Sequence, residues 1–244
     1  MDWSSDGGMR VAFFGGSFDP PHQGHLAVAR AAQAALGLDT VLFAPVGAQP
    51  LKPQGSSASF EDRVAMTRLA IASDPGFAVS LIDAPKSTAA PNYTIETLLS
   101  LRSELPPGGT LFFLMGADSF LGLHRWHRAA EIPFVAPLIV ASRPGQPLED
   151  LEAALPPGLT IEPDLRALPS RRESGDASFD LRTFHIHGHG VHTAPLYLLP
   201  GLHVDISASQ VREQIHALPA LFPPAPRLLS NSVLDYIRSH GLYR

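Results

Sequence analysis

The sequence predicts an α/β protein with an open, doubly wound, mostly parallel sheet and a small helical C-terminal part. Short apolar runs alternate with helical stretches along most of the chain, and the first three elements follow one another as strand, helix and strand. Such a succession implies parallel pairing, and ligands of these sheets bind beyond the carboxyl ends of the strands. Hydrophobic residues make up 45% of the 244 residues, which is enough for a full core.

The first βαβ unit is expected between residues 11 and 44. The apolar run 11–14 is typical of a buried strand and leads directly into Gly15 and Gly16. An Ala-rich helix over 24–36 is expected to stop at Gly37, because glycine commonly terminates helices. A second strand follows over 40–44.

The same alternation continues toward the C-terminus. Ser59 and Asp62 have the spacing of a capping box and predict a helix over about 59–73. Another helix is expected to begin near Thr94, and a last helix over about 232–239 ends before Gly241. Further strands are expected at 77–82, 110–115, 138–141 and 196–199.

Residues 156–195 break this rhythm. The segment is rich in proline, glycine, charge and histidine, and it is expected to be a long loop inserted into a single domain over 9–244 that follows a tail of residues 1–8. The segment carries His185, His187, His189 and His192. If it were extended, the first three would line one face, which is one possible arrangement for a metal site. A solvated insertion is the favoured interpretation, and no function is assigned to it.

Composition excludes several classes of protein. Cysteine is absent, so there is no disulfide, thiolate nucleophile or cysteine-ligated zinc. The net charge of −5 disfavours a nucleic-acid partner. The N-terminus has acidic residues where a signal peptide has basic ones. No apolar run is long enough to span a membrane. A cytoplasmic location is therefore expected.

The most informative stretch runs from Gly15 to His25, with the sequence GGSFDPPHQGH. It follows a strand and precedes a helix, so its backbone N–H groups can point at an anion. The glycines permit a close approach, and His22 and His25, three residues apart, can face one side of the first helical turn. Two imidazoles at a helix N-terminus suit a polyphosphate on which negative charge develops. An ordinary turn with surface histidines remains an alternative, and a zinc site is disfavoured.

A second polar stretch, ISASQVR over 206–212, lies near the other end of the chain. Ser207 or Ser209 can cap a helix and offer donors to phosphate, and Arg212 can reach the same anion with a fork of N–H groups. Taken alone, an ordinary capped helix explains this stretch equally well.

Together the two stretches resemble the GxFDPxHxGH and ISxSxxR signatures of the nucleotidyltransferase superfamily, in the same order and on a matching α/β pattern. The resemblance implies a Rossmann-like nucleotidyltransferase fold. Intermediate segments are similar to those of bacterial nicotinate-nucleotide adenylyltransferases over most of the chain. They are NYTIETL at 92–98, GADS at 116–119, Trp126, a strand ending in RPG at 138–145, and the C-terminal YI and GLY.

The resemblance implies transfer of the adenylyl group of ATP to nicotinate mononucleotide, by direct in-line attack of the 5′-phosphate on the α-phosphorus. Mg²⁺ would arrive with ATP. The catalytic residues implied are His22, His25, Lys52 and Arg212. The ATP-binding residues implied are Gly15, Gly16, Ser17, Phe18, His22, His25, Asp118, Ile206, Ser207, Ser209 and Arg212. The mononucleotide-binding residues implied are Tyr93, Thr94, Trp126 and Arg143, and no protein-held metal is expected.

Several of these residues have simpler alternatives. Trp126 fits a core position, Tyr93 and Thr94 fit a helix cap, Asp118 also fits a cap, and Arg143 fits a turn. The chain also departs from the family pattern, because Leu51 stands where a histidine usually precedes the lysine, here Lys52.

Competing functions also stay open at this point. They are use of nicotinamide mononucleotide or phosphopantetheine as acceptor, a nucleotide-binding protein without catalysis, and a metal-handling protein built on the His-rich segment. A homo-oligomer is left open, and neither nucleic acid nor membrane is expected as a partner.

Overall fold

The computed structural model describes residues 8–51, 54–142, 151–165, 170–174, 177–188, 190–199, 206–217 and 228–244. The chain divides into two compact units, each drawn from separate segments. Unit 1 comprises Met1–Phe14, Val28–Val41 and Tyr93–His203, and unit 2 comprises Gly15–Ala27, Leu42–Asn92 and Val204–Arg244. Residues 1–7 of the expected tail lie outside the described residues, and the single domain over 9–244 stays a prediction.

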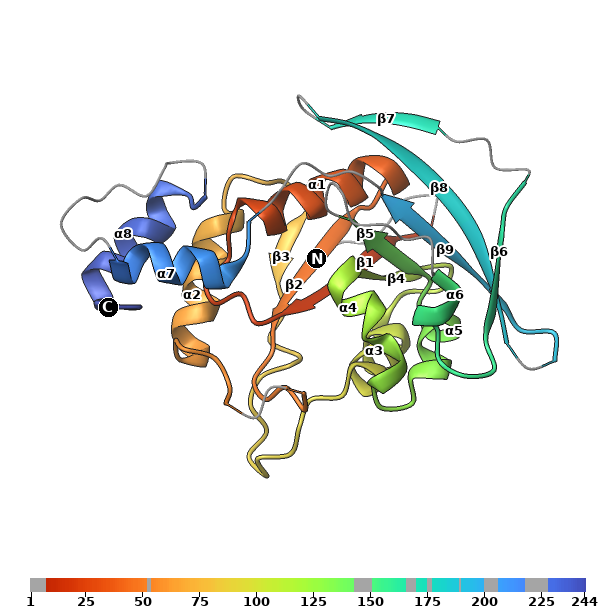
Figure 1. Ribbon diagram of the computed structural model, residues 1–244, viewed down its shortest axis with the longest axis horizontal. Coiled ribbons are helices and arrows are strands. Elements are labelled where there is room, and N and C mark those ends of the chain that lie inside the picture. The colour runs from red at the N-terminus through yellow and green to blue at the C-terminus, as the bar shows by residue number, and fades with distance from the viewer. Residues whose placement is uncertain are drawn as a thin grey trace. The chain divides into compact units, whose positions relative to one another are not determined.

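The strands form a sheet in the order β3-β2-β1-β4-β5-β9-β8-β6, with β7 paired to β8 (Figure 1). The pairs β1–β4, β4–β5 and β5–β9 are parallel, and β8 is antiparallel to β6, β7 and β9. The α/β class and the parallel centre of the sheet are therefore confirmed. The strands are β1 Arg10–Gly16, β2 Thr40–Pro45, β3 Phe77–Val79, β4 Thr110–Gly116, β5 Leu138–Ala141, β6 Thr160–Pro163, β7 Ser170–Ser174, β8 Ala177–His187 and β9 Thr193–Leu199.

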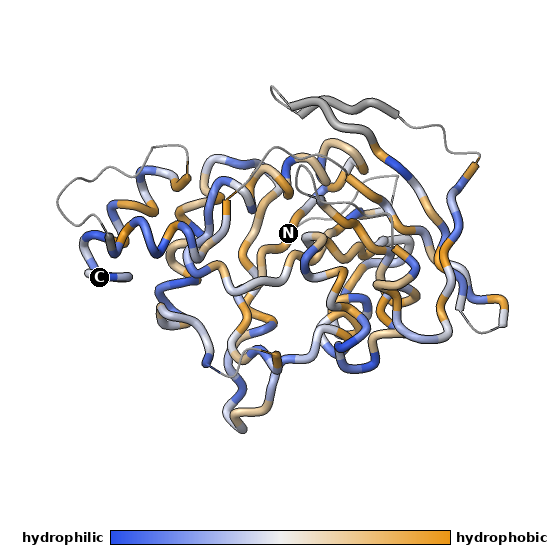
Figure 2. Tube along the Cα trace, viewed as in Figure 1, coloured by the Kyte–Doolittle hydropathy of each residue, from blue (hydrophilic) through white to orange (hydrophobic). Residues whose placement is uncertain are grey.

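Unit 1 is built on the parallel strands β1, β4, β5 and β9. These strands are apolar along nearly their whole length, as strands covered on both faces are, and Figure 2 shows their hydrophobic residues. Phe13 packs on Phe113, with ring centroids 5.6 Å apart, across the β1–β4 pair. Gly116 at the end of β4 is in register with Ala141 at the end of β5, so both strands end at one edge.

The helices expected near 24–36, 59–73, 94 and 232–239 are present as α1 Gln23–Leu36, α2 Phe60–Ile71, α3 Thr94–Glu104 and α8 Asn231–His240. The described residues also form α4 Ala117–Leu121, α5 Ile132–Val135, α6 Leu151–Ala154 and α7 Ala208–Ala217. Ser59 caps α2, accepting from the Asp62 N–H, and its hydroxyl holds the pKa of the Asp62 carboxyl below its usual range. Gly37 and Gly241 follow α1 and α8 in the left-handed region, with φ of 57° and 63°. No helix in the described part of the chain is long and apolar enough to cross a membrane.

Residues 156–195 contain β6, β7 and β8 and the start of β9 instead of the expected long loop. The physical reason is the alternation of Phe184, His185, Ile186 and His187, in which histidine takes the polar positions of a strand. His185 Nε2 lies 3.2 Å from Asp164 Oδ2, and His187 Nε2 lies 2.9 Å from Glu162 Oε1. The residue at position 189 lies outside the described residues.

Unit 2 contains the chain between β1 and α1, the helix α2, strand β3 and the C-terminal helices α7 and α8. Helix α8 packs on α2 (Figure 1). At this contact the Tyr236 hydroxyl donates to Asp62 Oδ1 over 2.9 Å. Phe18, Phe43 and Met66 are fully buried in this unit. The core of unit 2 therefore includes the loop that follows β1.

Candidate active site

The loop that joins β1 to α1 is folded back on itself in unit 2. Phe18 adopts a left-handed backbone with φ of 47°, and its ring is 1% exposed. A Cβ added at Gly16 would lie 3.2 Å from that ring, so glycine lets the ring pack there. The Phe18 ring meets the His25 ring edge-on, with centroids 5.0 Å apart. The loop is therefore held by its own buried aromatic side chain.

His22 and His25 lie side by side at the N-terminus of α1, as expected. Their ring centroids are 3.8 Å apart, and His22 is 7% exposed while His25 is half-buried. The backbone N–H of His22 donates to Nδ1 of His25 over 3.1 Å. Because Nδ1 accepts a hydrogen bond, the neutral His25 ring carries its proton on Nε2. This Nε2–H group can donate a hydrogen bond to an anion.

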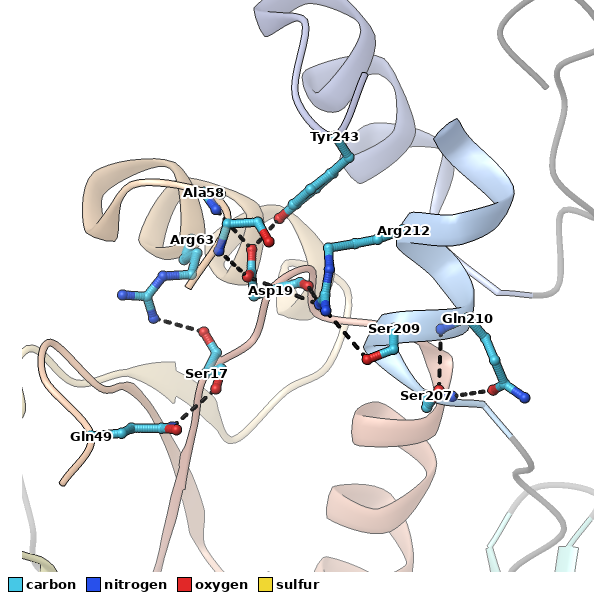
Figure 3. A network of polar contacts seen from close by, with 11 residues as sticks. Ser17, Asp19, Gln49, Ala58, Arg63, Ser207, Ser209, Gln210, Arg212 and Tyr243 are labelled. Carbon is cyan, nitrogen blue, oxygen red and sulfur yellow. Dashed lines mark hydrogen bonds and ion pairs between the residues drawn. The ribbon is translucent and has the colours of Figure 1, made fainter. Parts of the chain in front are cut away.

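Asp19 is buried at the centre of a polar network in unit 2 (Figure 3). Its carboxylate accepts from the backbone N–H groups of Ser57, at 2.6 Å, and Ala58, at 3.1 Å. The hydroxyl of Tyr243 donates to the same carboxylate over 2.7 Å. A buried carboxylate needs such donors, because burial without them is costly. Neither Asp19 nor Tyr243 was among the expected site residues.

Arg212 is attached to the same loop. One of its Nη atoms donates to the carbonyl of Asp19 over 2.7 Å and lies 3.9 Å from the Asp19 carboxylate, and the other donates to Ser209 Oγ over 3.2 Å (Figure 3). Ser207 caps α7 in a reciprocal box with Gln210, at 3.2 Å and 2.8 Å. The structure therefore brings the ISASQVR stretch to the histidine loop, and of the two serines it is Ser207 that caps the helix.

Arg63 is a further structural residue that sequence reasoning missed. It is 2% exposed and donates to the carbonyls of Ser17, at 2.7 Å, and Val46, at 2.9 Å. Burial lowers the pKa of Arg63, and the Asp19 charge opposes that effect. The sequence does contain a signal for the burial of Arg63. At helical spacing Arg63 falls on the apolar stripe of α2 together with Met66 and Ala70, where a charged residue is rare.

Of the residues expected to bind the mononucleotide, the structure describes Tyr93, Thr94 and Trp126, and all three lie in unit 1. Thr94 is the first residue of α3. The side chain of the preceding Tyr93 makes no cap bond, whereas its carbonyl accepts from the N–H of Glu96 over 3.0 Å, so the N–H groups of Thr94 and Ile95 receive no bond from that side chain. The Tyr93 ring lies against His127, with centroids 4.4 Å apart. The half-buried Trp126 directly precedes His127 in the chain, and its ring faces Phe113 of β4, with centroids 6.0 Å apart. Asp118 is exposed in the first turn of α4, just beyond β4.

Gly15 and Ile206 are half-buried at their expected places in the two stretches. Gln49 Nε2 donates to Ser17 Oγ over 2.9 Å, which holds the hydroxyl of that loop residue. The expected residues Lys52 and Arg143 lie outside the described residues. The exposed Leu51 directly precedes Lys52.

The fold and the two signature stretches are those of a nucleotidyltransferase, and comparison with known proteins agrees. The family model for cytidylyltransferase-like proteins matches residues 13–214. Full-length relatives named "Probable nicotinate-nucleotide adenylyltransferase" occur in Trichlorobacter lovleyi, at 36% identity over 97% of this chain and 100% of the relative, and in Aeromonas hydrophila, at 38% identity over 96% and 97%. The chain belongs to the nicotinate-nucleotide adenylyltransferase family.

Solved structures show the same fold at lower sequence similarity. The nicotinic acid mononucleotide adenylyltransferase of Plasmodium falciparum, complexed with NaAD, matches with a TM-score of 0.64 at 16% identity, covering 96% of this chain and 97% of that one. The same protein complexed with APC gives a TM-score of 0.63. The Rossmann-like nucleotidyltransferase fold predicted from sequence is thereby confirmed.

Proposed function

We propose that this chain transfers the adenylyl group of ATP to nicotinate mononucleotide, releasing pyrophosphate and forming nicotinate adenine dinucleotide. The observation that carries the proposal is that Arg212 donates to the carbonyl of Asp19, in the same loop that places His22 and His25 at the start of α1. Family membership supplies the reaction, and these contacts supply a phosphate-binding group at the start of a helix.

Both reactants are charged phosphates, so the protein must position them and offset their repulsion. The acceptor's 5′-phosphate oxygen attacks the α-phosphorus of ATP in line, and the bond from that phosphorus to the β-phosphate oxygen breaks. No covalent enzyme intermediate is required. Nε2–H of His25, together with His22, donates to the phosphoryl oxygens as charge shifts toward pyrophosphate.

Apart from Asp118, the remaining ATP contacts are assigned to groups near these histidines in sequence or elsewhere in unit 2. Gly15, Gly16, Ser17 and Phe18 supply loop backbone, and Ile206, Ser207 and Ser209 supply the start of α7. Arg212 and Lys52 neutralise the triphosphate. Asp118, which is exposed beyond β4, accepts from ribose or adenosine donors. In these roles the two signature stretches bind the phosphates of ATP, and the Asp118 carboxylate binds its nucleoside.

For the mononucleotide, we assign Tyr93, Thr94, Trp126 and Arg143. The first N–H groups of α3, whose N-cap Tyr93 gives no side-chain bond, suit the nicotinate carboxylate. The half-buried indole of Trp126 offers a face on which the pyridine ring can stack. This arrangement favours the acid over the amide, because the amide lacks the negative charge that a helix N-terminus attracts.

Mg²⁺ is assigned to the ATP phosphates rather than to a protein site. Among the described residues, no three histidine or acidic side chains converge as metal ligands. The buried Asp19 carboxylate is already bonded to two backbone N–H groups and a hydroxyl. When bound with ATP, the ion neutralises phosphate charge, and no step is assigned to a protein-held metal. We further propose a cytoplasmic enzyme that acts on small molecules without a nucleic-acid or membrane partner.

The test is pyrophosphate release by the purified chain with MgATP and, in parallel, nicotinate mononucleotide, nicotinamide mononucleotide or phosphopantetheine. Turnover that strongly favours nicotinate mononucleotide and stops when EDTA removes Mg²⁺ is expected. Preference for another acceptor would keep the nucleotidyltransferase and refute the pocket assignment. ATP binding without turnover would refute the activity.

A further inference from the structure

Tyr243, which follows helix α8, contacts the loop that carries His22 and His25. The Tyr243 hydroxyl donates to Asp19 Oδ1 over 2.7 Å (Figure 3). Burial, reinforced by this bond to a carboxylate, raises the pKa of Tyr243 far above its usual range, so the hydroxyl keeps its proton and remains a donor. Asp19 stands three residues before His22 in the same loop.

The backbone that leads to this contact has a defined turn after α8. Helix α8 ends in a Schellman-type turn, in which Gly241 N–H donates to Arg238 O and Leu242 N–H donates to Ile237 O. Tyr243 follows with a φ of 62°, a left-handed conformation that is unfavourable for tyrosine. A residue keeps such a conformation where its surroundings favour it, and here the hydrogen bond to Asp19 is the compensating contact.

Asp19 is the group through which this contact reaches the phosphate-binding residues. Its carboxylate holds the backbone of Ser57 and Ala58, ahead of α2, and its carbonyl accepts from the guanidinium of Arg212. The neighbouring Phe18 contacts the His25 ring. A shift of Asp19 therefore moves both Arg212 and the segment before the histidines.

We propose that Tyr243 is a positioning residue for adenylyl transfer: its hydroxyl fixes Asp19, and through Asp19 the orientation of the β1–α1 loop and of Arg212. The inference rests on the proposed function for its kinetic readout, and it makes the last turn of the chain part of the phosphate-binding machinery. Tyr243 itself contacts no reacting atom in this scheme.

The test is the full-length Tyr243→Phe variant, which removes the hydroxyl and keeps the ring. Asp19 then lacks one donor, so kcat is expected to fall about tenfold, the scale of one hydrogen bond to a charged group. The Kd of MgATP is expected to rise several-fold. The KM of nicotinate mononucleotide is expected to stay within about twofold, since its assigned residues are elsewhere in the chain.

Tyr236→Phe is the matched control. It also removes a tyrosine hydroxyl that donates to a carboxylate, Asp62 Oδ1 at 2.9 Å, and it lies in the same C-terminal segment. Both variants lose one bond between the C-terminal segment and the rest of unit 2, so their thermal unfolding is compared first. Wild-type kcat and MgATP affinity are expected for Tyr236→Phe. Equal losses in both variants would overturn the positioning role, because general loosening of the C-terminus would then explain them.

A double-mutant cycle with Asp19→Ala, which removes the acceptor, isolates the bond. If Tyr243 acts through Asp19, the double variant is expected to bind MgATP about as weakly as Asp19→Ala alone, whereas independent effects would multiply and contradict the inference.

Calorimetric MgATP binding separates this inference from the proposed function. A wild-type chain that binds MgATP but does not turn over refutes the function, and weaker binding by Tyr243→Phe than by Tyr236→Phe still supports positioning. A Tyr243→Phe variant with wild-type turnover and wild-type MgATP affinity refutes positioning and leaves the function standing.

Discussion

Two histidine-containing regions of this chain differ in what surrounds their imidazoles. In the β1–α1 loop, His22 is buried, and Nδ1 of His25 accepts a backbone N–H. On β8, His185 and His187 lie partly exposed beside Glu162 of the neighbouring strand β6 and Asp164, which directly follows β6. The first pair is built into a turn by buried contacts, and the second pair belongs to the polar face of a strand.

This comparison indicates that backbone placement, more than the number of histidines, distinguishes the proposed phosphate-binding loop from the polar face of a strand. The β1–α1 loop is tied to Arg63 and Arg212 through backbone carbonyls, and its Asp19 is tied to the C-terminus. Those bonds restrict where the imidazole N–H groups can point, and preorganised donors are what stabilise developing charge. Partly exposed histidine–carboxylate pairs, by contrast, contribute little to stability.

The largest expected effect comes from His25→Ala. Loss of one preorganised donor to the transferring phosphate should lower kcat by about 10²–10³-fold. Pyrophosphate release at saturating MgATP and nicotinate mononucleotide measures it. A kcat near that of the wild type would remove His25 from the mechanism and erase the contrast between the two regions.

Arg63→Met should mainly affect folding. The substitution leaves the carbonyls of Ser17 and Val46 without their guanidinium donors, which should lower the free energy of unfolding by about 2–4 kcal/mol. Urea denaturation measures this change. Arg68→Met, at an exposed position on the same helix, is the control and should change the free energy of unfolding little. Equal stability of the two variants would contradict a structural role for Arg63.

Arg212→Lys should lower kcat/KM for MgATP about tenfold. Lysine keeps the charge, but it lacks the planar fork that reaches both the Asp19 carbonyl and Ser209 Oγ. Steady-state kinetics with MgATP varied measures the loss. If lysine supports wild-type kcat/KM, charge alone suffices at this position and the fork geometry has no catalytic role.

The smallest effect is expected for His187→Gln. The imidazole lies 2.9 Å from Glu162 Oε1, but the glutamate is largely exposed, so the free energy of unfolding should change by less than about 1 kcal/mol. The kcat should stay within about twofold of the wild type. Pyrophosphate release and thermal unfolding together measure both quantities. A large loss of kcat would show that β8 takes part in the reaction.

Sequence reasoning recovered the parts of the molecule that local signals encode. The apolar run at residue 138 gave the bounds of β5, and the spacing of Ser59 and Asp62 identified the cap of α2. The histidine motif was placed at a strand–helix junction because glycines and a helical pattern flank it. Such features depend on neighbours in the chain.

Features that depend on distant residues were missed. Nothing near Tyr243 in the sequence indicates that its hydroxyl meets Asp19, which is separated from it by most of the chain. The strands within 156–195 were missed because proline, glycine and charge obscured a period-two pattern, although pairing of β8 with β9 stabilises it. Arg63 was missed because periodicity was read only for apolar residues.

The most direct test of the contrast is single-turnover formation of nicotinate adenine dinucleotide, with enzyme in excess and the His25→Ala and His187→Gln variants compared with the wild type. Under these conditions neither the active fraction nor product release limits the rate. The predicted result is a chemical step slowed at least about 100-fold in His25→Ala and unchanged in His187→Gln. Similar rates in the two variants would contradict the assignment of catalysis to the β1–α1 loop.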